Sequence, residues 1–291
     1  MKAWLSDYWW MVLLGIVCVV VLAFTIGNIQ MNRMIARETE TLVSSKDRAD
    51  SEAPDIIKEE DLENLPVPVK RWLENAGVVG HGEIRAMELT QVGTMRLDPE
   101  KEKWMESVAH QTINVKDPGF IWHVDLPVMP LLSARGKDLY QEGEGSMTIR
   151  VGGLLPVAHE KSNDKLNESS LHRFLMEVPW YPSQALEDNM AWEAIDDKSA
   201  KGILTHKGIS VEAIFTFDDE GLIKRVEASR YKETDDDATR IPCIGTIKAY
   251  TAVDGVKVPS EIEITWMLEE GPFTWYRFET KAMRFIEQKT S

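Results

Sequence analysis

The stretch "ISVEAIFTF" (residues 209–217) decides the fold class, because apolar and polar side chains alternate along it. Its odd-numbered positions are all apolar, whereas Ser210, Glu212 and Thr216 lie between them. A period of two predicts a half-buried β-strand. The same alternation occurs in residues 87–97 and 261–268, so the chain contains several strands with one face toward a core.

Further strands are expected on both sides of these three. They cover residues 102–115, 119–125, 133–142, 146–151, 191–196, 200–207, 222–232, 244–253 and 273–286. Turn sequences such as "DPEK" at 98 and "DDEG" at 218 separate many of them. Connections this short predict antiparallel neighbours, since a parallel pair needs a long crossover. A sheet of about eleven or twelve strands has to curl, close or split.

One region of the predicted sheet has a helical period instead. In "LHRFLMEVPWYPSQAL" (171–186), Leu171, Phe174, Leu175 and Val178 form one apolar stripe. We expect a helical insertion at about 165–190, capped by Asn167 or Ser169 and ended by two prolines. A second, short helix is expected in "NLPVPVKRWLENAG" (64–77).

The N-terminal segment predicts a membrane anchor. Residues 8–27 carry no charge and are about as numerous as an α-helix needs to cross a bilayer. A cleaved signal peptide is the alternative, but the run is long and lacks a small-residue cleavage pattern. Arginine and lysine lie mostly after the span, which favours a cytoplasmic soluble part. That rule weakens for long domains, so the side of the membrane stays open.

These patterns divide the chain into three parts. Residues 1–32 hold the anchor with its short flank, residues 33–63 form a polar acidic tether, and residues 64–291 form the curved antiparallel β domain with its helical insertion. The expected location is a membrane, crossed once through residues 8–27.

Composition excludes some classes of partner. The formal net charge is -15, and an acidic surface disfavours nucleic acid. No cofactor motif is present, and the six histidines show no metal-ligand spacing. Cys18 lies in the apolar segment, so a disulfide with Cys243 is not expected.

The layout resembles a known architecture. An antiparallel meander curved into an unclosed barrel, with a helix across its mouth, is similar to the LolA/LolB-like lipoprotein-carrier half-barrel. The segments "ARGKDLYQEGEGSM" (134–147), "LHRFLMEVPWYPSQAL" and "PVPVKRWL" (66–73) resemble an uncharacterised family of bacterial membrane-anchored proteins, a domain of unknown function. This likeness implies domain extent and anchoring, and it assigns no chemistry.

Several side chains of the insertion are candidates for a ligand site. Arg173 and Glu177 stand four residues apart on the helix face opposite the apolar stripe, where they form either a solvated surface pair or polar groups in the roof of a pocket. Trp180, Tyr181 and Trp192 are candidates for a lid edge, although such aromatic residues are more often core.

Three further candidates lie on predicted strands. Asp138 and Tyr140 share a face, as cavity-rim groups or as part of a polar hairpin. Arg230 shares parity with Val226 and Ala228, which directs it inward, but Lys224 shares it too, so exposure at a strand edge is favoured. None of these candidates is assigned to catalysis or to a metal.

Three functions remain in order of support. The first is a membrane-tethered binding module that holds a lipid or other amphiphile in the half-barrel. The second is a protein-interaction or assembly domain whose sheet is filled by its own side chains. The third, an enzyme with an unrecognised carboxylate site, has the least support, so the sequence leans against an enzyme.

Overall fold

The computed structural model describes residues 9–44, 55–129 and 132–286 of the chain. A single antiparallel sheet of 13 strands forms most of it, in the order β6-β5-β4-β3-β2-β1-β13-β12-β11-β10-β9-β8-β7. The strands are β1 Ala86–Met95, β2 Met105–Asn114, β3 Gly119–Met129, β4 Leu132–Gln141, β5 Glu144–Val151, β6 Leu155–Glu160, β7 Met190–Asp196, β8 Ser199–His206, β9 Ile209–Phe217, β10 Ile223–Tyr231, β11 Arg240–Val253, β12 Val256–Leu268 and β13 Gly271–Phe285.

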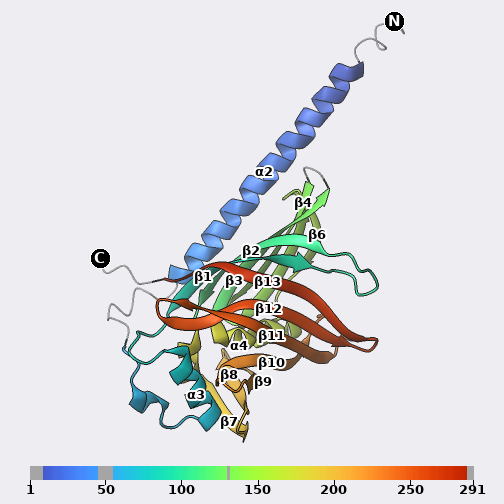
Figure 1. Ribbon diagram of the computed structural model, residues 1–291. Coiled ribbons are helices and arrows are strands. Elements are labelled where there is room, and N and C mark those ends of the chain that lie inside the picture. The colour runs from blue at the N-terminus through green and yellow to red at the C-terminus, as the bar shows by residue number, and fades with distance from the viewer. Residues whose placement is uncertain (1–8, 45–54, 130–131, 287–291) are drawn as a thin grey trace, which may run out of the picture.

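The sheet curls around a helical segment that joins its two edges. Helix α4 (Asp164–Met176) and the 3₁₀ turns η2 (Val178–Trp180) and η3 (Pro182–Leu186) connect edge strand β6 to edge strand β7. Figure 1 shows α4 inside the curve of the sheet. The prediction of an unclosed antiparallel half-barrel with a helical insertion is therefore confirmed.

One strand was not predicted. β6 carries no alternation of apolar and polar side chains, because most of its side chains are exposed on both faces of this edge strand. Its Pro156 is also typical of an edge, since proline cannot donate a hydrogen bond to a neighbouring strand.

The concave face of the sheet holds the main core. Helix α3 (Val67–Ala76) closes one part of it with Trp72, which is fully buried against Trp192 and Phe217. Gly77 ends α3 with a left-handed backbone at φ 78°, a conformation that glycine adopts readily. The turn η1 (Glu59–Leu62) precedes it.

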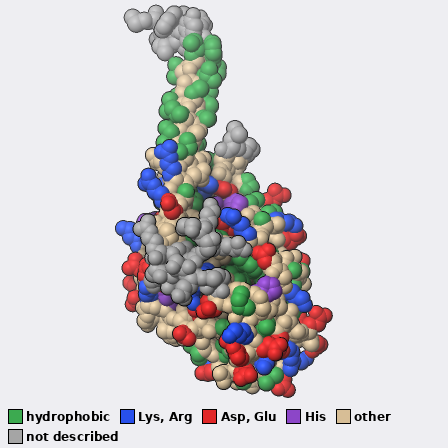
Figure 2. All heavy atoms as spheres, turned by 90° about the vertical axis from the view of Figure 1, so that its left-hand side faces the viewer, with side chains coloured by type: hydrophobic (Ala, Val, Ile, Leu, Met, Phe, Trp, Pro, Cys, Tyr) green, Lys and Arg blue, Asp and Glu red, His purple; other side chains and the backbone are tan. Residues whose placement is uncertain are grey.

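A 36-residue helix, α2 (Trp9–Ser44), projects from the domain. It is long and apolar enough to cross a membrane, a test that a signal sequence near an N-terminus also passes. Figure 2 shows apolar side chains along the projecting part and basic side chains where the helix reaches the domain.

The second half of α2 lies on the outer face of the sheet. Met31, Ile35 and Leu42 are buried there with Ile121, in a cluster separate from the main core. Residues 33–44 therefore continue the helix instead of belonging to a tether, because apolar side chains recur at helical spacing within this polar segment.

A buried ion pair adds to this contact. The Lys137 ammonium, only 4% exposed, lies 2.6 Å from a carboxylate oxygen of Glu38 on the helix. Arg135 hydrogen-bonds both Asp125 and helix residue Asn32. Both basic side chains belong to β4, so this strand fixes the position of α2 along the sheet.

The hairpin between β5 and β6 also lies close against α2. A side chain at Gly153 (φ 71°) would come within 2.6 Å of the backbone nitrogen of Asn28. A side chain at Gly27 would come within 2.5 Å of Leu154 Cγ. Helix and hairpin therefore meet almost backbone to backbone, which only glycine allows.

Candidate functional site

A cavity of about 330 Å³ lies between α4 and the concave face of the sheet, where residues of β1, β3 to β6 and β10 to β13 line it. Aromatic and aliphatic side chains form most of its wall. They include Phe120, Trp122, Trp180, Ile262, Ile264, Trp266, Trp275, Tyr276 and Phe278. Of the eight candidate residues, Asp138, Arg173, Glu177, Trp180 and Arg230 border the cavity.

The cavity follows strand β12. Trp266 and Ile264 border one part of it, and Ile262 and Pro259 border it further along the same strand. At ~3.3 Å per residue, the seven steps from Trp266 to Pro259 cover about 23 Å. The lining therefore extends over a long part of β12.

Helix α4 is positioned by the cap at its start. The Asn163 side chain accepts a hydrogen bond from the Leu166 backbone at 2.9 Å, so Asn163 is the N-cap. The predicted caps are wrong, because both side chains have other partners. Asn167 accepts a hydrogen bond from the Gly145 backbone, and Ser169 donates one to the Tyr231 carbonyl.

The other end of α4 places the charged pair in the cavity wall. The last helical residue is Met176 and Glu177 is the C-cap, with Pro179 following as expected. Arg173 Nε donates to Glu177 Oε1 at 2.8 Å, and Arg173 Nη1 donates to Asp138 Oδ2 at 2.9 Å. The pair is therefore enclosed in the domain and is not a solvated surface pair.

A glutamine completes this cluster. Gln111 on β2 accepts from Arg173 Nη2 at 3.3 Å and donates to Glu177 Oε2 at 2.6 Å. The Arg173 guanidinium also lies over the rings of Phe120 and Trp122, at 4.7 and 5.1 Å from their centroids. We call Arg173, Glu177, Asp138 and Gln111 the roof cluster.

The electrostatics of the roof cluster are unequal. Burial disfavours the Arg173 cation, but Glu177 and Asp138 together raise its pKa. Burial also raises the pKa of Asp138, and the nearby Arg173 compensates for this only in part. Arg173 is therefore held as a cation mainly by Glu177, and burial makes Asp138 harder to ionise than an exposed aspartate.

A second glutamine supports the wall beside this cluster. Gln91 Oε1 accepts hydrogen bonds from Trp122 Nε1 at 3.0 Å and from the Tyr276 hydroxyl at 3.1 Å. Burial raises the pKa of Tyr276, so its hydroxyl stays protonated and can donate. Gln91 therefore fixes the orientation of two aromatic side chains that border the cavity.

Sequence reasoning missed both glutamines. Gln91 shares parity with the buried Leu89 and Met95 on β1, and Gln111 shares parity with the buried Ala109 on β2. A glutamine at an inward position of an alternating strand needs a hydrogen-bond partner inside the domain. The inward position of these two glutamines could therefore have predicted a polar network inside the domain.

Arg230 points into the cavity, and its predicted exposure at a strand edge is wrong. The pairing of β10 with β9 shifts register between Ile223 and Arg225, so Lys224 sits in an irregularity and drops out of the alternation. Val226, Ala228 and Arg230 then share the inward face. The Arg230 guanidinium stacks over Trp266 at 5.4 Å and hydrogen-bonds Ser169 Oγ at 3.1 and 3.2 Å.

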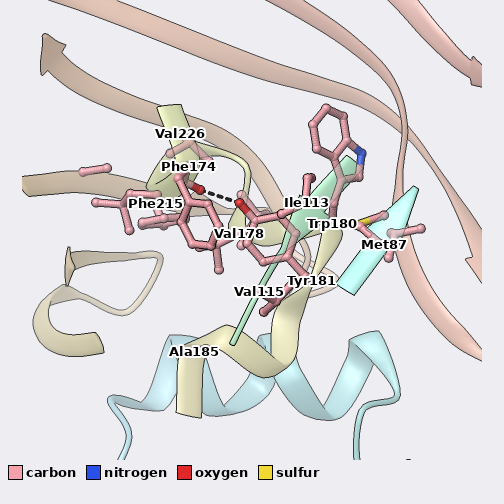
Figure 3. Close-up of a cluster of buried hydrophobic side chains, with 14 of the residues drawn as sticks. Met87, Ile113, Val115, Phe174, Val178, Trp180, Tyr181, Ala185, Phe215 and Val226 are labelled. Atoms are coloured by element: carbon pink, nitrogen blue, oxygen red, sulfur yellow. Dashed lines mark hydrogen bonds between the residues drawn. The ribbon is translucent and has the colours of Figure 1, made fainter. Parts of the chain in front are cut away.

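Trp180 and Tyr181 lie side by side but have different surroundings. Trp180 borders the cavity, and its Nε1 donates to the Pro259 carbonyl at 3.0 Å. Tyr181 is fully buried in the core, where its hydroxyl donates to the Phe174 carbonyl at 2.6 Å (Figure 3). The structure thus brings only Trp180 of this pair to the cavity.

Trp192 and Tyr140 lie away from the cavity. Trp192 packs on Trp72 and Phe215. Tyr140 is fully buried, and its hydroxyl pairs with His206 Nδ1 at 3.0 Å. Both side chains belong to the core between the sheet and the helices, so neither lies at the rim.

Comparison with known proteins identifies a family but assigns it no function. A family model described as a family of unknown function (DUF6920) matches residues 63–285. No curated protein matches the chain. A crystal structure of a LolA superfamily protein from Nitrosomonas europaea is similar over 76% of this chain and 95% of its own, with a TM-score of 0.41 and 11% identity.

Proposed function

The chain belongs to the DUF6920 family, whose function is unknown, and we propose from its own residues that it is a membrane-tethered module that binds an amphiphile. The ligand occupies the cavity beneath α4. The apolar part of α2 provides the tether.

The cavity is the observation that carries this proposal. About 330 Å³ of space remains between α4 and the sheet, within the range typical of small-molecule sites. Its wall is mainly aromatic and aliphatic, with a few polar groups held in place by hydrogen bonds. A sheet filled by its own side chains, as an assembly domain requires, would leave no such space.

The tether rests on the exposed part of α2. Its apolar side chains between Trp9 and Ile26 are largely exposed in the described chain, and exposing so many side chains to water is unfavourable. A bilayer covers them. Residues 9–26 are about long enough to cross its hydrocarbon core.

Occupancy can be tested with the full chain extracted together with its surrounding lipid by an amphipathic polymer. Mass spectrometry should identify an amphiphile enriched with the wild-type protein. The comparison variant is Gly245→Phe, which fills the cavity. Gly245 borders it, and an added Cβ would meet only Ile264 Cδ1 at 3.8 Å and the Val226 carbonyl oxygen at 3.9 Å.

Thr246→Phe is the matched control. Thr246 is the next residue of β11 and points to the other face of the sheet. The amphiphile should be present with wild type and Thr246→Phe and depleted at least several-fold with Gly245→Phe. Equal lipid composition in all three preparations would refute the proposal, since lipid that only surrounds α2 does not depend on Gly245.

A carboxylate in the cavity keeps an enzyme as a second candidate. Burial raises the pKa of Asp138, which is a feature of many acid–base groups. However, Asp138 is already engaged by Arg173, and burial raises the pKa of the nearby Cys243 thiol, which makes it a poor nucleophile. A mass change of the co-purified amphiphile on incubation would favour the enzyme.

A further inference from the structure

Two arginines border the same cavity, but only one of them has a carboxylate partner. Arg173 pairs with both Glu177 and Asp138. Within the described ranges, no carboxylate forms an ion pair with Arg230, whose hydrogen bonds go to the neutral Ser169 hydroxyl. Ser169 donates its own proton to the Tyr231 carbonyl, so its oxygen accepts from Arg230 as a neutral group and does not compensate the charge.

The surroundings of Arg230 make an unpaired cation costly. The guanidinium lies between Trp266, Ser169 and the buried Cys243, and it is part-exposed because it borders the cavity. Burial lowers the pKa of Arg230, and Arg173 nearby acts in the same direction, whereas Cys243, Glu177 and Asp138 offset this only in part, the two carboxylates from beyond ion-pair distance. A charge that is mostly buried and has no ion-pair partner destabilises a fold. A purely structural side chain at this position would not need to be charged.

From this geometry we infer that Arg230 binds the anionic head group of a single-chain amphiphile whose tail lies along β12 toward Trp180. The inference rests on the proposed function and specifies the ligand class. The planar guanidinium presents several N–H donors to a carboxylate or a phosphate, the two head groups it suits best.

The arrangement of the wall fits this orientation. Tyr231, Lys232, Glu233 and Thr234 border the cavity directly after Arg230, and Lys232 and Glu233 are exposed to solvent. The cavity therefore has a polar end beside Arg230. Away from it, the part of the wall along β12 and β13 is apolar and includes Ile264, Ile262, Phe278 and Trp180, while the self-paired roof cluster lies on the side of α4. Polar and apolar parts of the ligand thus have separate partners.

The size of the cavity favours one chain over two. A volume of about 330 Å³ is near the lower limit for ligand sites, which run from ~300 to ~1,000 Å³. A lipid with two acyl chains would need more space.

The carboxylates in the same wall already have other partners, so they leave Arg230 available to an anionic ligand. Asp138 and Glu177 both accept hydrogen bonds from Arg173, and Glu160 accepts one from Thr234 at 2.6 Å. Lys232 is an exposed cation paired with Glu233. Arg230 is therefore the cation of the described cavity wall that an incoming anion can pair with.

Three soluble ten-carbon amphiphiles test the inference on the full chain in lipid nanodiscs, with empty nanodiscs subtracted. Titration calorimetry compares decanoate, decyl phosphate and 1-decanol. We expect the wild type to bind at least one anion about tenfold or more tightly than the alcohol, since a hydrogen-bonded charge adds ~1.5–3 kcal/mol. Preference for decanoate or for decyl phosphate distinguishes a carboxylate ligand from a phosphate ligand.

Arg230→Gln removes the charge and keeps most of the side chain. It should abolish the preference for anions and leave the affinity for 1-decanol within about twofold. Arg225→Gln is the control, because Arg225 lies on the same strand, is exposed and pairs with Glu227. It should behave as the wild type does.

A melting temperature for each variant separates binding from folding. Without ligand, Arg230→Gln should be at least as stable as the wild type, because an unpaired buried charge has been removed. Equal affinity of the wild type for all three compounds overturns the Arg230 inference and leaves the proposed function intact. Failure of all three to bind overturns the proposed function as well.

Discussion

Replacing Arg173 with methionine removes the only cation of the roof cluster while retaining an apolar side chain of similar length. Glu177 and Asp138 then remain without their charged partner, and Gln111 loses the donor to its side-chain oxygen. The Arg173→Met protein should therefore be much less stable than its small change in volume implies.

The exposure of the two carboxylates sets the size of this effect. Breaking a buried ion pair costs ~3–5 kcal/mol when a charge remains behind. The Glu177 side chain is 13% exposed, but Asp138 is 32% exposed because it borders the cavity and can be hydrated there. We therefore expect the lower part of the range, about 3 kcal/mol, or about 6–12 °C in melting temperature for a domain of this size.

Circular dichroism of the full chain in nanodiscs can measure the melting temperature. The matched control is Arg284→Met, because Arg284 is 71% exposed and pairs with Glu88 on the surface. It should cost less than about 1 kcal/mol. Adding Glu177→Gln to Arg173→Met should restore at least half of the loss. If Arg173→Met melts within about 2 °C of the wild type, the roof cluster is not the buried network described above.

Two further predictions concern other parts of the chain. Burial lowers the pKa of His172 to about 3, whereas the unfolded chain takes up the proton near ~6.5. The free energy of unfolding should therefore fall as the pH falls below ~6.5, by about 2 kcal/mol at pH ~5. The His172→Gln protein should show a smaller drop in melting temperature between pH ~7.5 and ~5 than the wild type does. Equal drops in the two proteins would contradict this. Gly27→Leu should detach α2 from the β5–β6 hairpin and broaden the distance distribution between spin labels at Arg37 and Glu193, with Cys18 and Cys243 replaced by serine. Gly15→Leu, where an added Cβ meets nothing within 4 Å, should keep it narrow; a narrow distribution in both would mean that the glycine contact does not hold the helix.

The strands were predictable where one face is wet and the other is buried. On β9, every odd-numbered side chain from Val211 to Phe217 is buried, as the alternation indicates. β6 was not predictable in the same way, since an exposed edge strand has no buried face to impose a period. The N-cap Asn163 was missed because several polar residues precede the apolar stripe, and sequence alone does not rank them.

The candidate site was predictable in its members more than in its geometry. Arg173, Glu177 and Asp138 could be selected from local patterns, but their meeting depends on how the sheet curls around α4. The inward direction of Arg230 depends on a register shift at Lys224, which alternation cannot reveal. Tyr140 and His206 are 66 residues apart in the sequence, and their hydrogen bond in the core also depends on the curl of the sheet.

The close contact of Gly27 with Gly153 limits how far the β domain can lie from the membrane. From residue 27 onward α2 belongs to the domain, and at ~1.5 Å per residue the free part, residues 9–26, spans about 27 Å. In the proposed function, a hydrocarbon core of ~30 Å takes up the whole of this length, so no stalk is left between bilayer and domain. If α2 is the proposed anchor, a domain mounted in this way cannot travel to a second membrane. In the proposed function, the amphiphile therefore enters and leaves within reach of one bilayer surface, and any onward delivery depends on an acceptor that comes to it.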